Sequence, residues 1–325
     1  MVPSQQPNLR PQPLAQRLLD GGSPGNEGLP QTWGVAYRPQ YFVELMAHPQ
    51  PPGPKEGGLK GAPCCTKSPP GQKVGWLEIL IDDFLSAYGD FACLDQLSAR
   101  YPLAFHGVSM SLGSADPLNF AYLARLRDAV ARYRPWVVSD HLCWVSQGGR
   151  YQYDLLPLPR NRSTADYVVD RIKAVQDFLG CQIAVENIAY YAASREDALA
   201  EPVWLIDIVT RADCALLLDL NNLHVNATNW AYDPFAFLTQ LRQGLPPTRF
   251  AQIHLAGYEE VDGLLIDTHN QPVASPVHDL WASFTDAVGF IPTCVEWDAN
   301  VPPLVDVLTA LRPFQQAAFK DKPSI

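Results

Sequence analysis

The chain has 325 residues, of which 47% are hydrophobic and 18% are charged, so it contains enough apolar material for a large folded core. Its 34 acidic and 24 basic residues give a formal net charge of −10, which argues against a nucleic-acid partner. No segment reaches the roughly 18 consecutive apolar residues of a membrane span, and the N-terminal segment lacks the apolar run of a secretory signal. We therefore expect a cytoplasmic protein with no membrane partner.

The length suits a single α/β barrel of about 250 residues that carries insertions. Residues 1–30 are predicted to be an N-terminal extension, 31–318 the barrel domain and 319–325 a C-terminal tail. Seven cysteines lack the CxxC spacing of a zinc ribbon, so neither a disulfide framework nor a cysteine–zinc site is expected. Cys64 and Cys65 are adjacent in a Pro/Gly/Lys-rich stretch, which predicts an exposed loop insertion over 49–72; a redox or partner-binding loop is the alternative.

Eight short apolar runs, rich in β-branched and aromatic residues, alternate with helix-like segments. In chain order the runs are 32–38, 74–81, 103–110, 135–142, 181–188, 214–221, 250–257 and 292–298. Nearly continuous apolar runs are typical of parallel strands that are buried on both faces. Among the intervening segments, 116–133 and 163–180 predict amphipathic helices, the second with a Ser/Thr/Asp start signal and Gly180 at its end.

Eight strand–helix units without internal sequence repeats predict an α/β fold of the (β/α)8 TIM-barrel type. An open doubly wound sheet is the alternative architecture. That architecture normally has a glycine-rich phosphate turn after an early strand, and neither GxGxxG nor GxxxxGKS/T occurs in the chain.

Polar residues able to bind a metal ion follow the apolar part of most runs, at the strand ends where barrel active sites lie. In chain order they are His106, Asp140, His141, Glu186, Asn187, Asp219, Asn222, His254, Asp267, His269 and Glu296. One such residue alone is usually a hydrogen-bonded structural group. Five or six strands that deliver carboxylates and imidazoles to one mouth, however, would bury like charges without compensation unless a cation lay among them.

The spacing of Asp267 and His269 supports this convergence, because residues two apart in an extended segment point to the same face. Carboxylates and imidazoles without thiolates suit zinc, iron or manganese, and the ligand type does not choose among them. The sequence therefore predicts a barrel with a multinuclear His/carboxylate metal centre.

At these residues the chain resembles the DUF692 or UPF0276 family of multinuclear non-haem iron-dependent oxidative enzymes, whose fold is similar to that of endonuclease IV and xylose isomerase. The matching stretches include HGVSMSLGSADPL (106–118), VVSDHLCW (137–144), VENIAYY (185–191), CALLLDLNNLHVNATN (214–229), IHLAG (253–257), LLIDTHNQPV (264–273) and PTCVEWDANVPPL (292–304). They run in one order from about residue 34 to 310.

The resemblance implies two or three iron ions, with O2 as co-substrate. It carries the metal ligands over to His106, His141, Glu186, Asp219, Asn222, His254, Asp267, His269 and Glu296, with Asp140 and Asn187 as further candidates. It also implies oxidation of cysteine in a Cys-containing ribosomally made precursor peptide, commonly with a separate partner protein that presents the peptide. Residues such as Asn187 and Tyr190 would orient the ligands. For Tyr190 and Tyr191, however, a packing role is the preferred interpretation.

The chain departs from the family pattern at several positions. Three family histidines are replaced, by Gln40, Trp230 and Tyr258. His224 stands where an aromatic or aliphatic residue is usual. Asp82 and Asp83 stand where the family more often has a glutamate followed by an asparagine. Two alternatives to the oxidative enzyme follow. The first is a metal-dependent hydrolase or endonuclease, which a basic strip across the mouth of the barrel would favour. The second is a non-catalytic metal-binding subunit that has lost activity together with the three histidines. No general base is assigned from the sequence.

Overall fold

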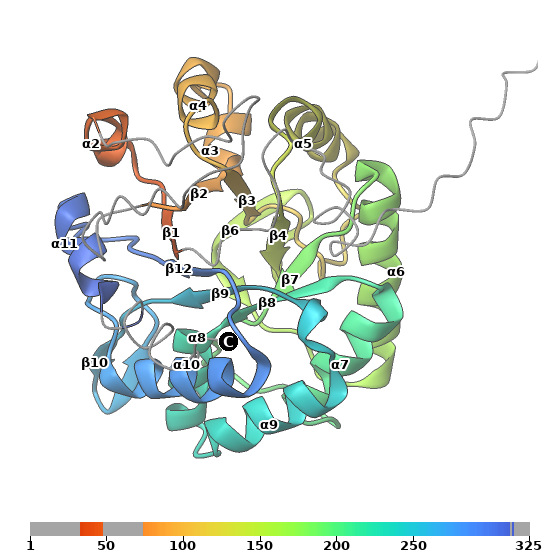
Figure 1. The fold of residues 1–325 in the computed structure, drawn as a ribbon. Helices are drawn as coiled ribbons and strands as arrows, with labels where there is room; N and C mark the ends of the chain where they lie inside the picture. Colours follow the sequence, from red (N-terminus) through yellow and green to blue (C-terminus); the bar gives the residue numbers. More distant parts are fainter. Residues whose placement is uncertain (1–32, 48–73, 313, 315–325) are drawn as a thin grey trace, which may run out of the picture.

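A computed structural model describes residues 33–47, 74–312 and 314. The predicted extension 1–30, the loop insertion 49–72 with Cys64 and Cys65, and the tail 319–325 lie outside the described residues. The described part forms a closed barrel of parallel strands surrounded by helices (Figure 1).

Eight parallel strands close the barrel, which confirms the predicted TIM-barrel fold. They are β1 (Trp33–Ala36), β2 (Trp76–Leu80), β3 (Leu103–Gly107), β4 (Val138–His141), β7 (Ala184–Glu186), β8 (Ala215–Asp219), β9 (Phe250–Leu255) and β12 (Thr293–Val295). They pair in this order, and β12 pairs with β1. Each lies within one of the eight apolar runs, and each is shorter than its run because the flanking residues leave the hydrogen-bonded ladder.

The helices cover the outside of the barrel (Figure 1). They are α2 (Phe42–Ala47), α3 (Ile81–Leu85), α4 (Phe91–Ser98), α5 (Phe120–Tyr133), α6 (Arg162–Leu179), α7 (Glu201–Ala212), α8 (Leu220–Asn229), α9 (Pro234–Gly244), α10 (Ser275–Val288) and α11 (Leu304–Ala310), with short 3-10 helices η1 (Pro39–Tyr41) and η2 (Pro247–Arg249). In the part of the chain that the structure describes, none of them has the length and apolar character needed to cross a membrane.

Capping residues set the helix boundaries. The predicted helix over 116–133 begins only at Phe120, because the Asn119 side chain accepts a hydrogen bond from the Tyr122 N–H and caps the helix there. Helix α6 begins one residue before the predicted segment, since its N-cap is Asn161. It ends as predicted at Gly180, whose φ of 70° is the left-handed conformation that favours glycine.

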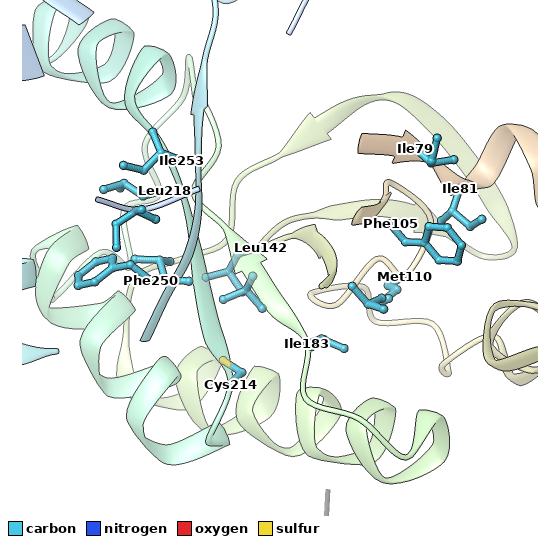
Figure 2. Close-up of a cluster of buried hydrophobic side chains, with 14 of the residues drawn as sticks. Ile79, Ile81, Phe105, Met110, Leu142, Ile183, Cys214, Leu218, Phe250 and Ile253 are labelled. Atoms are coloured by element: carbon cyan, nitrogen blue, oxygen red, sulfur yellow. The ribbon is translucent and has the colours of Figure 1, made fainter. Parts of the chain in front are cut away.

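Two apolar layers lie on opposite faces of the strands because side chains alternate along each strand. One layer packs the strands against the helices; Figure 2 shows part of it, including Ile79, Phe105, Leu218 and Ile253. The other is a separate cluster of buried side chains that alternate with the first set along the strands. It consists of Ala36, Trp76, Ala104, Trp136, Val137, Ala184, Ala215, Leu217, Ala251 and Cys294.

Two antiparallel hairpins that the sequence analysis did not predict follow barrel strands. Hairpin β5 (Trp144–Gln147) and β6 (Arg150–Leu156) follows β4, and hairpin β10 (Glu259–Val261) and β11 (Leu264–Ile266) follows β9. Both have two-residue turns, Gly148–Gly149 and Asp262–Gly263, with positive φ at each position. Gly-Gly and Asp-Gly are strong hairpin signals in a sequence. Because they follow the carboxyl ends of strands, both hairpins lie at the mouth of the barrel.

Candidate metal centre

Polar side chains replace apolar ones at the carboxyl ends of the strands. Side chains two residues apart on a strand lie on the same face, and on four strands the residue two positions after a member of the second apolar cluster is polar. These steps lead from Ala104 to His106, from Ala184 to Glu186, from Leu217 to Asp219 and from Cys294 to Glu296. All four of these polar residues are buried. The barrel fold alone therefore brings side chains from distant segments together at the mouth.

His106, His141 and Glu186 form a first cluster. The Nε2 atoms of the two histidines are 3.3 Å apart, and they lie 3.3 and 3.5 Å from Oε2 of Glu186. The three residues come from β3, β4 and β7, which are neighbours in the barrel. Their donor atoms are close enough to one another to hold one metal ion.

Hydrogen bonds at the opposite side of each ring orient these two histidines. Nδ1 of His106 lies 2.8 Å from Oγ of Ser139, and that hydroxyl donates to the Phe105 carbonyl at 3.3 Å. The hydroxyl therefore accepts a hydrogen bond from Nδ1–H. Likewise, Nδ1 of His141 donates to the Gly107 carbonyl at 3.2 Å. Both Nε2 atoms are thus left with a lone pair directed at the cluster, as a metal ligand requires.

The charge state of His106 agrees with this arrangement. Burial lowers the pKa of His106 well below its usual range, and the nearby imidazoles of His141 and His254 lower that pKa further. His106 is therefore neutral at physiological pH, which is the form that binds a metal ion.

His254 is the centre of a second cluster with Glu186, Asp219 and Glu296. Its Nδ1 lies 3.4 Å from Oε1 of Glu186 and 3.3 Å from Oε2 of Glu296. Glu186, Asp219 and His254 have donor atoms close enough to share one ion. Burial alone would lower the pKa of His254, but the surrounding carboxylates raise it well above its usual range. The site therefore stabilises positive charge at this point.

Asp219 and Asn222 begin helix α8. Oδ1 of Asp219 accepts the Asn222 N–H at 2.7 Å and caps the helix, which leaves Oδ2 without a hydrogen bond within the described structure. Burial raises the pKa of Asp219 well above its usual range, and the charge of Glu186 raises it further. A cation beside Oδ2 would offset this unfavourable burial.

Asp267 and His269 form a third group, and their side chains contact each other at 2.8 Å, in agreement with the same-face expectation. Nδ1 of His269 is also 3.4 Å from Oε2 of Glu296, so this group adjoins the second cluster. Asp219, His269 and Glu296 have donor atoms close enough to share an ion. His269 has a φ of 47°, a left-handed conformation that is rare for a non-glycine residue and often marks a functional site.

Asp140 and Asn187 support the strand ends instead of facing the clusters. The carboxylate of Asp140 accepts the N–H groups of Met110 at 3.0 Å and His141 at 2.8 Å. The amide of Asn187 donates to the Asp219 carbonyl and accepts the Asp219 N–H, both at 2.9 Å. Tyr191, at the rim, accepts a hydrogen bond from the Asp267 N–H at 2.8 Å.

Glu78 is a buried carboxylate of the site that the sequence analysis missed. It lies in β2, two residues after Trp76, with 2% of its surface exposed, and it contacts His254. The sequence signal is a charged residue inside the apolar run VGWLEILI, which Asp82 and Asp83 follow. Asp82 instead accepts the Val108 N–H at 2.9 Å.

The site contains many buried polar atoms that make no hydrogen bond to any described residue. They include Oε1 of Glu78, Oε2 of Glu186, Oδ2 of Asp219, Oδ1 of Asn222, Nδ1 of His254 and both ring nitrogens of His269. Some of these atoms lie at ion-pair distance from one another, but without hydrogen-bond geometry. Leaving such groups unpaired is costly, and metal ions bound among them would satisfy them together. The residues therefore fit a multinuclear metal centre.

A cavity of about 620 Å³ opens above the clusters. Metal-ligand candidates line its floor, and Tyr151, Gln152, Asp154 and Leu155 of strand β6 line a wall. Among the described lining residues, Arg38 is the single arginine or lysine, and it pairs with Asp298. The described lining therefore lacks the basic strip that would favour a nucleic-acid substrate.

The three positions that lack family histidines do not line this cavity within the described structure. Gln40 lies in η1 and is exposed, and Trp230 stacks on Tyr190 with ring centroids 5.7 Å apart. Tyr258 lies against His224, with ring centroids 5.0 Å apart. This contact places the imidazole of His224 beside Tyr258.

The fold and the clusters define a TIM-barrel protein with candidate metal sites at the carboxyl ends of its strands. The chain belongs to the family described as RiPP precursor modification enzyme MbnB/TglH/ChrH, whose sequence profile matches residues 62–318; RiPPs are ribosomally synthesised and post-translationally modified peptides. It is 43% identical over 277 residues to a UPF0276 protein of Acaryochloris marina, covering 85% of this chain and 91% of that protein. It is also 43% identical over 272 residues to a UPF0276 protein of Anaeromyxobacter sp., covering 83% and 87%.

Solved structures with the same fold are more distant in sequence. A 3-keto-D-glucoside 4-epimerase from E. coli matches with a TM-score of 0.53 and 12% identity, covering 88% of this chain and 98% of that one. Endonuclease IV from Thermus thermophilus matches with a TM-score of 0.52 and 16% identity, covering 74% and 89%. At these identities the similarity shows the fold alone.

Proposed function

We propose that this protein is an iron- and O2-dependent enzyme that oxidises cysteine in a ribosomally synthesised precursor peptide. Two or three iron ions would be held by His106, His141, Glu186, Asp219, Asn222, His254, Asp267, His269 and Glu296. The observation that carries the proposal is the first cluster, in which two imidazoles and one carboxylate meet below an open cavity. Two histidines and one carboxylate with open positions are typical of non-haem iron(II) centres that use oxygen.

Bound iron would supply the one-electron chemistry with O2 that zinc lacks. The residues of the chain prepare the site for it. Ser139 and the Gly107 carbonyl hold Nδ1 of His106 and of His141, which directs the two Nε2 atoms at the cluster. Glu186 directs one oxygen to the first cluster and the other to His254, so it connects two clusters.

A peptide substrate agrees with the size and position of the cavity. Its volume of about 620 Å³ exceeds what metal ions need, and it falls in the range of small-molecule and side-chain binding sites. Strand β6 forms one wall, so a peptide segment with its cysteine side chain directed at the floor has space beside this hairpin. A separate protein that presents the peptide is part of the proposal, on the family resemblance.

The test is anaerobic loading of the metal-free protein with Fe(II) or with Zn(II), followed by exposure to air with a Cys-containing peptide encoded beside the gene. Oxygen uptake and peptide mass are measured, with the Cys→Ser peptide as the control. We expect oxygen uptake and a mass change only with iron and only with the cysteine peptide. Activity with zinc, or equal activity on the serine peptide, would contradict the proposal and favour a hydrolase.

A further inference from the structure

Glu78 is a buried carboxylate of β2 that lines the cavity and contacts His254, and it is not among the proposed metal ligands. We propose that Glu78 is a positioning residue that selects which ring nitrogen of His254 faces the metal centre. The inference rests on the proposed metal-dependent function. It concerns a residue outside the ligand set given above, and its test reads metal binding directly.

The two ring nitrogens of His254 face different groups. Nε2 lies 2.9 Å from Oε2 of Glu78, whereas Nδ1 is directed at Glu186 and Glu296, at 3.4 and 3.3 Å. His254 is fully buried and Glu78 nearly so, which excludes solvent as a competing partner. An ionised carboxylate only accepts hydrogen bonds, so Nε2 keeps its hydrogen towards Glu78, and Nδ1 is the nitrogen at which a metal ion would replace a proton.

Gln252 contacts the same oxygen of Glu78. Its side-chain nitrogen donates to Oε2 of Glu78 and also lies 2.7 Å from Nε2 of His254, so the assignment of the hydrogen to Nε2 rests on the Glu78 contact alone. Glu78, His254 and Glu296 are close enough to hold an ion, and Oε1 of Glu78 makes no hydrogen bond to a described residue, but Oε2, the oxygen beside Nε2 of His254, already accepts a hydrogen bond from the Gln252 amide. An amide NH2 donates hydrogen bonds and does not bind cations. Glu78 therefore acts on the metal through His254, as carboxylates behind metal-bound histidines do.

The barrel consequently uses opposite nitrogens in adjacent clusters. His106 presents Nε2 because Ser139 holds its Nδ1, whereas His254 presents Nδ1 because Glu78 holds its Nε2. This contrast supplies a matched comparison, since Glu78→Gln should weaken the cluster of His254 and Ser139→Ala should weaken the cluster of His106.

The experiment titrates metal-free protein with 113Cd(II), a diamagnetic probe, using protein labelled with 15N at its seven histidines. In the unsubstituted protein we expect cadmium–nitrogen coupling at Nδ1 of His254 and at Nε2 of His106. Glu78→Gln should lower the affinity of the His254 cluster about 10- to 100-fold, with the full number of ions recovered at saturation. Ser139→Ala should leave that cluster's affinity unchanged.

Three results would overturn the inference: coupling at Nε2 of His254, an unchanged affinity in Glu78→Gln, or the loss of one ion at saturating cadmium, which would make Glu78 a ligand. Circular dichroism of the metal-free variants checks folding. If Glu78→Gln does not fold, Gln252→Met removes the amide beside Glu78 and should give a smaller loss of affinity. Because cadmium supports no oxidation, these results stand apart from the iron and O2 test, and failure of oxidation alone leaves them intact.

Discussion

Glu186 contributes one carboxylate oxygen to each of two clusters. This arrangement predicts how many bound metal ions the protein loses when Glu186 is replaced by alanine. Its Oε2 lies near Nε2 of His106 and of His141, and its Oε1 lies near Nδ1 of His254. Among the described residues, His141 belongs to one cluster only. Glu186→Ala should therefore lose about two metal equivalents, whereas His141→Ala should lose about one, because an ion needs three or more protein ligands to stay bound.

The same change should have opposite effects on stability with and without metal. An ion at 100 times its Kd stabilises the fold by about 2.7 kcal/mol, which corresponds to a rise in Tm of roughly 4–5 °C for a domain of this size. Glu186→Ala should lose most of this rise. In metal-free protein, however, the substitution removes a buried carboxylate with an unpartnered oxygen, so the Tm of the variant should equal or exceed that of the unsubstituted protein.

The measurements are metal content by elemental analysis after anaerobic loading and Tm by calorimetry with and without chelator. Glu186→Gln, which keeps the side-chain volume, controls for the cavity that alanine leaves. If Glu186→Ala and His141→Ala lose the same number of ions, Glu186 does not connect two sites. If metal-free Glu186→Ala melts well below the unsubstituted protein, the carboxylate stabilises the fold without metal and the reasoning from unpaired atoms is wrong.

Two further predictions concern residues outside the clusters. Burial, opposed by Arg160, raises the pKa of Glu201 from 4.5 to about 7, so its contribution to stability is complete below pH 4.5 and is lost as pH rises through 7. Urea denaturation measures the unfolding free energy of Glu201→Gln and of the unsubstituted protein at pH 4.5 and at pH 8. From the lower to the higher pH, the difference between the variant and the unsubstituted protein should change by about 3 kcal/mol in favour of the variant. The exposed Glu260→Gln serves as the control, and an equal change there would refute the assignment. For the contact between the rings of His224 and Tyr258, His224→Ala and Tyr258→Ala should show a coupling of about 0.5–1.5 kcal/mol in a double-mutant cycle, and strictly additive effects would contradict it.

The strand positions were predictable because a strand buried on both faces needs a continuous apolar run, and eight such runs are readable without knowledge of their partners. The polar residues at their ends follow from the same pattern, since the fold brings all carboxyl ends to one mouth. Local signals also sufficed for the end of α6 at Gly180. The Gly148–Gly149 and Asp262–Gly263 turns are an equally local signal for the two hairpins.

The details of the site were less accessible because they depend on contacts between distant segments. Ser139 holds His106 across 33 positions of the chain, and Glu78 holds His254 across 176. The local sequence around Ser139 or around Glu78 does not indicate which distant histidine the side chain contacts. Strand periodicity would nevertheless have pointed to Glu78, because it is in phase with Trp76 and therefore faces the barrel interior.

The positions of the missing histidines bear on whether activity has been lost. A non-catalytic subunit was considered because Gln40, Trp230 and Tyr258 replace histidines of the family pattern. The described cavity is lined by none of the three, whereas His106, His141, Glu186, Asn222, Asp267, His269 and Glu296 all line it. Tyr258 also keeps an imidazole beside it, that of His224. The replacements therefore leave the clustered donors in place, and the reason for inferring an inactive subunit is weakened. Full metal loading of a Gln40→His, Trp230→His, Tyr258→His triple variant should match that of the unsubstituted protein, and a gain of bound ions would show that these positions do contribute ligands.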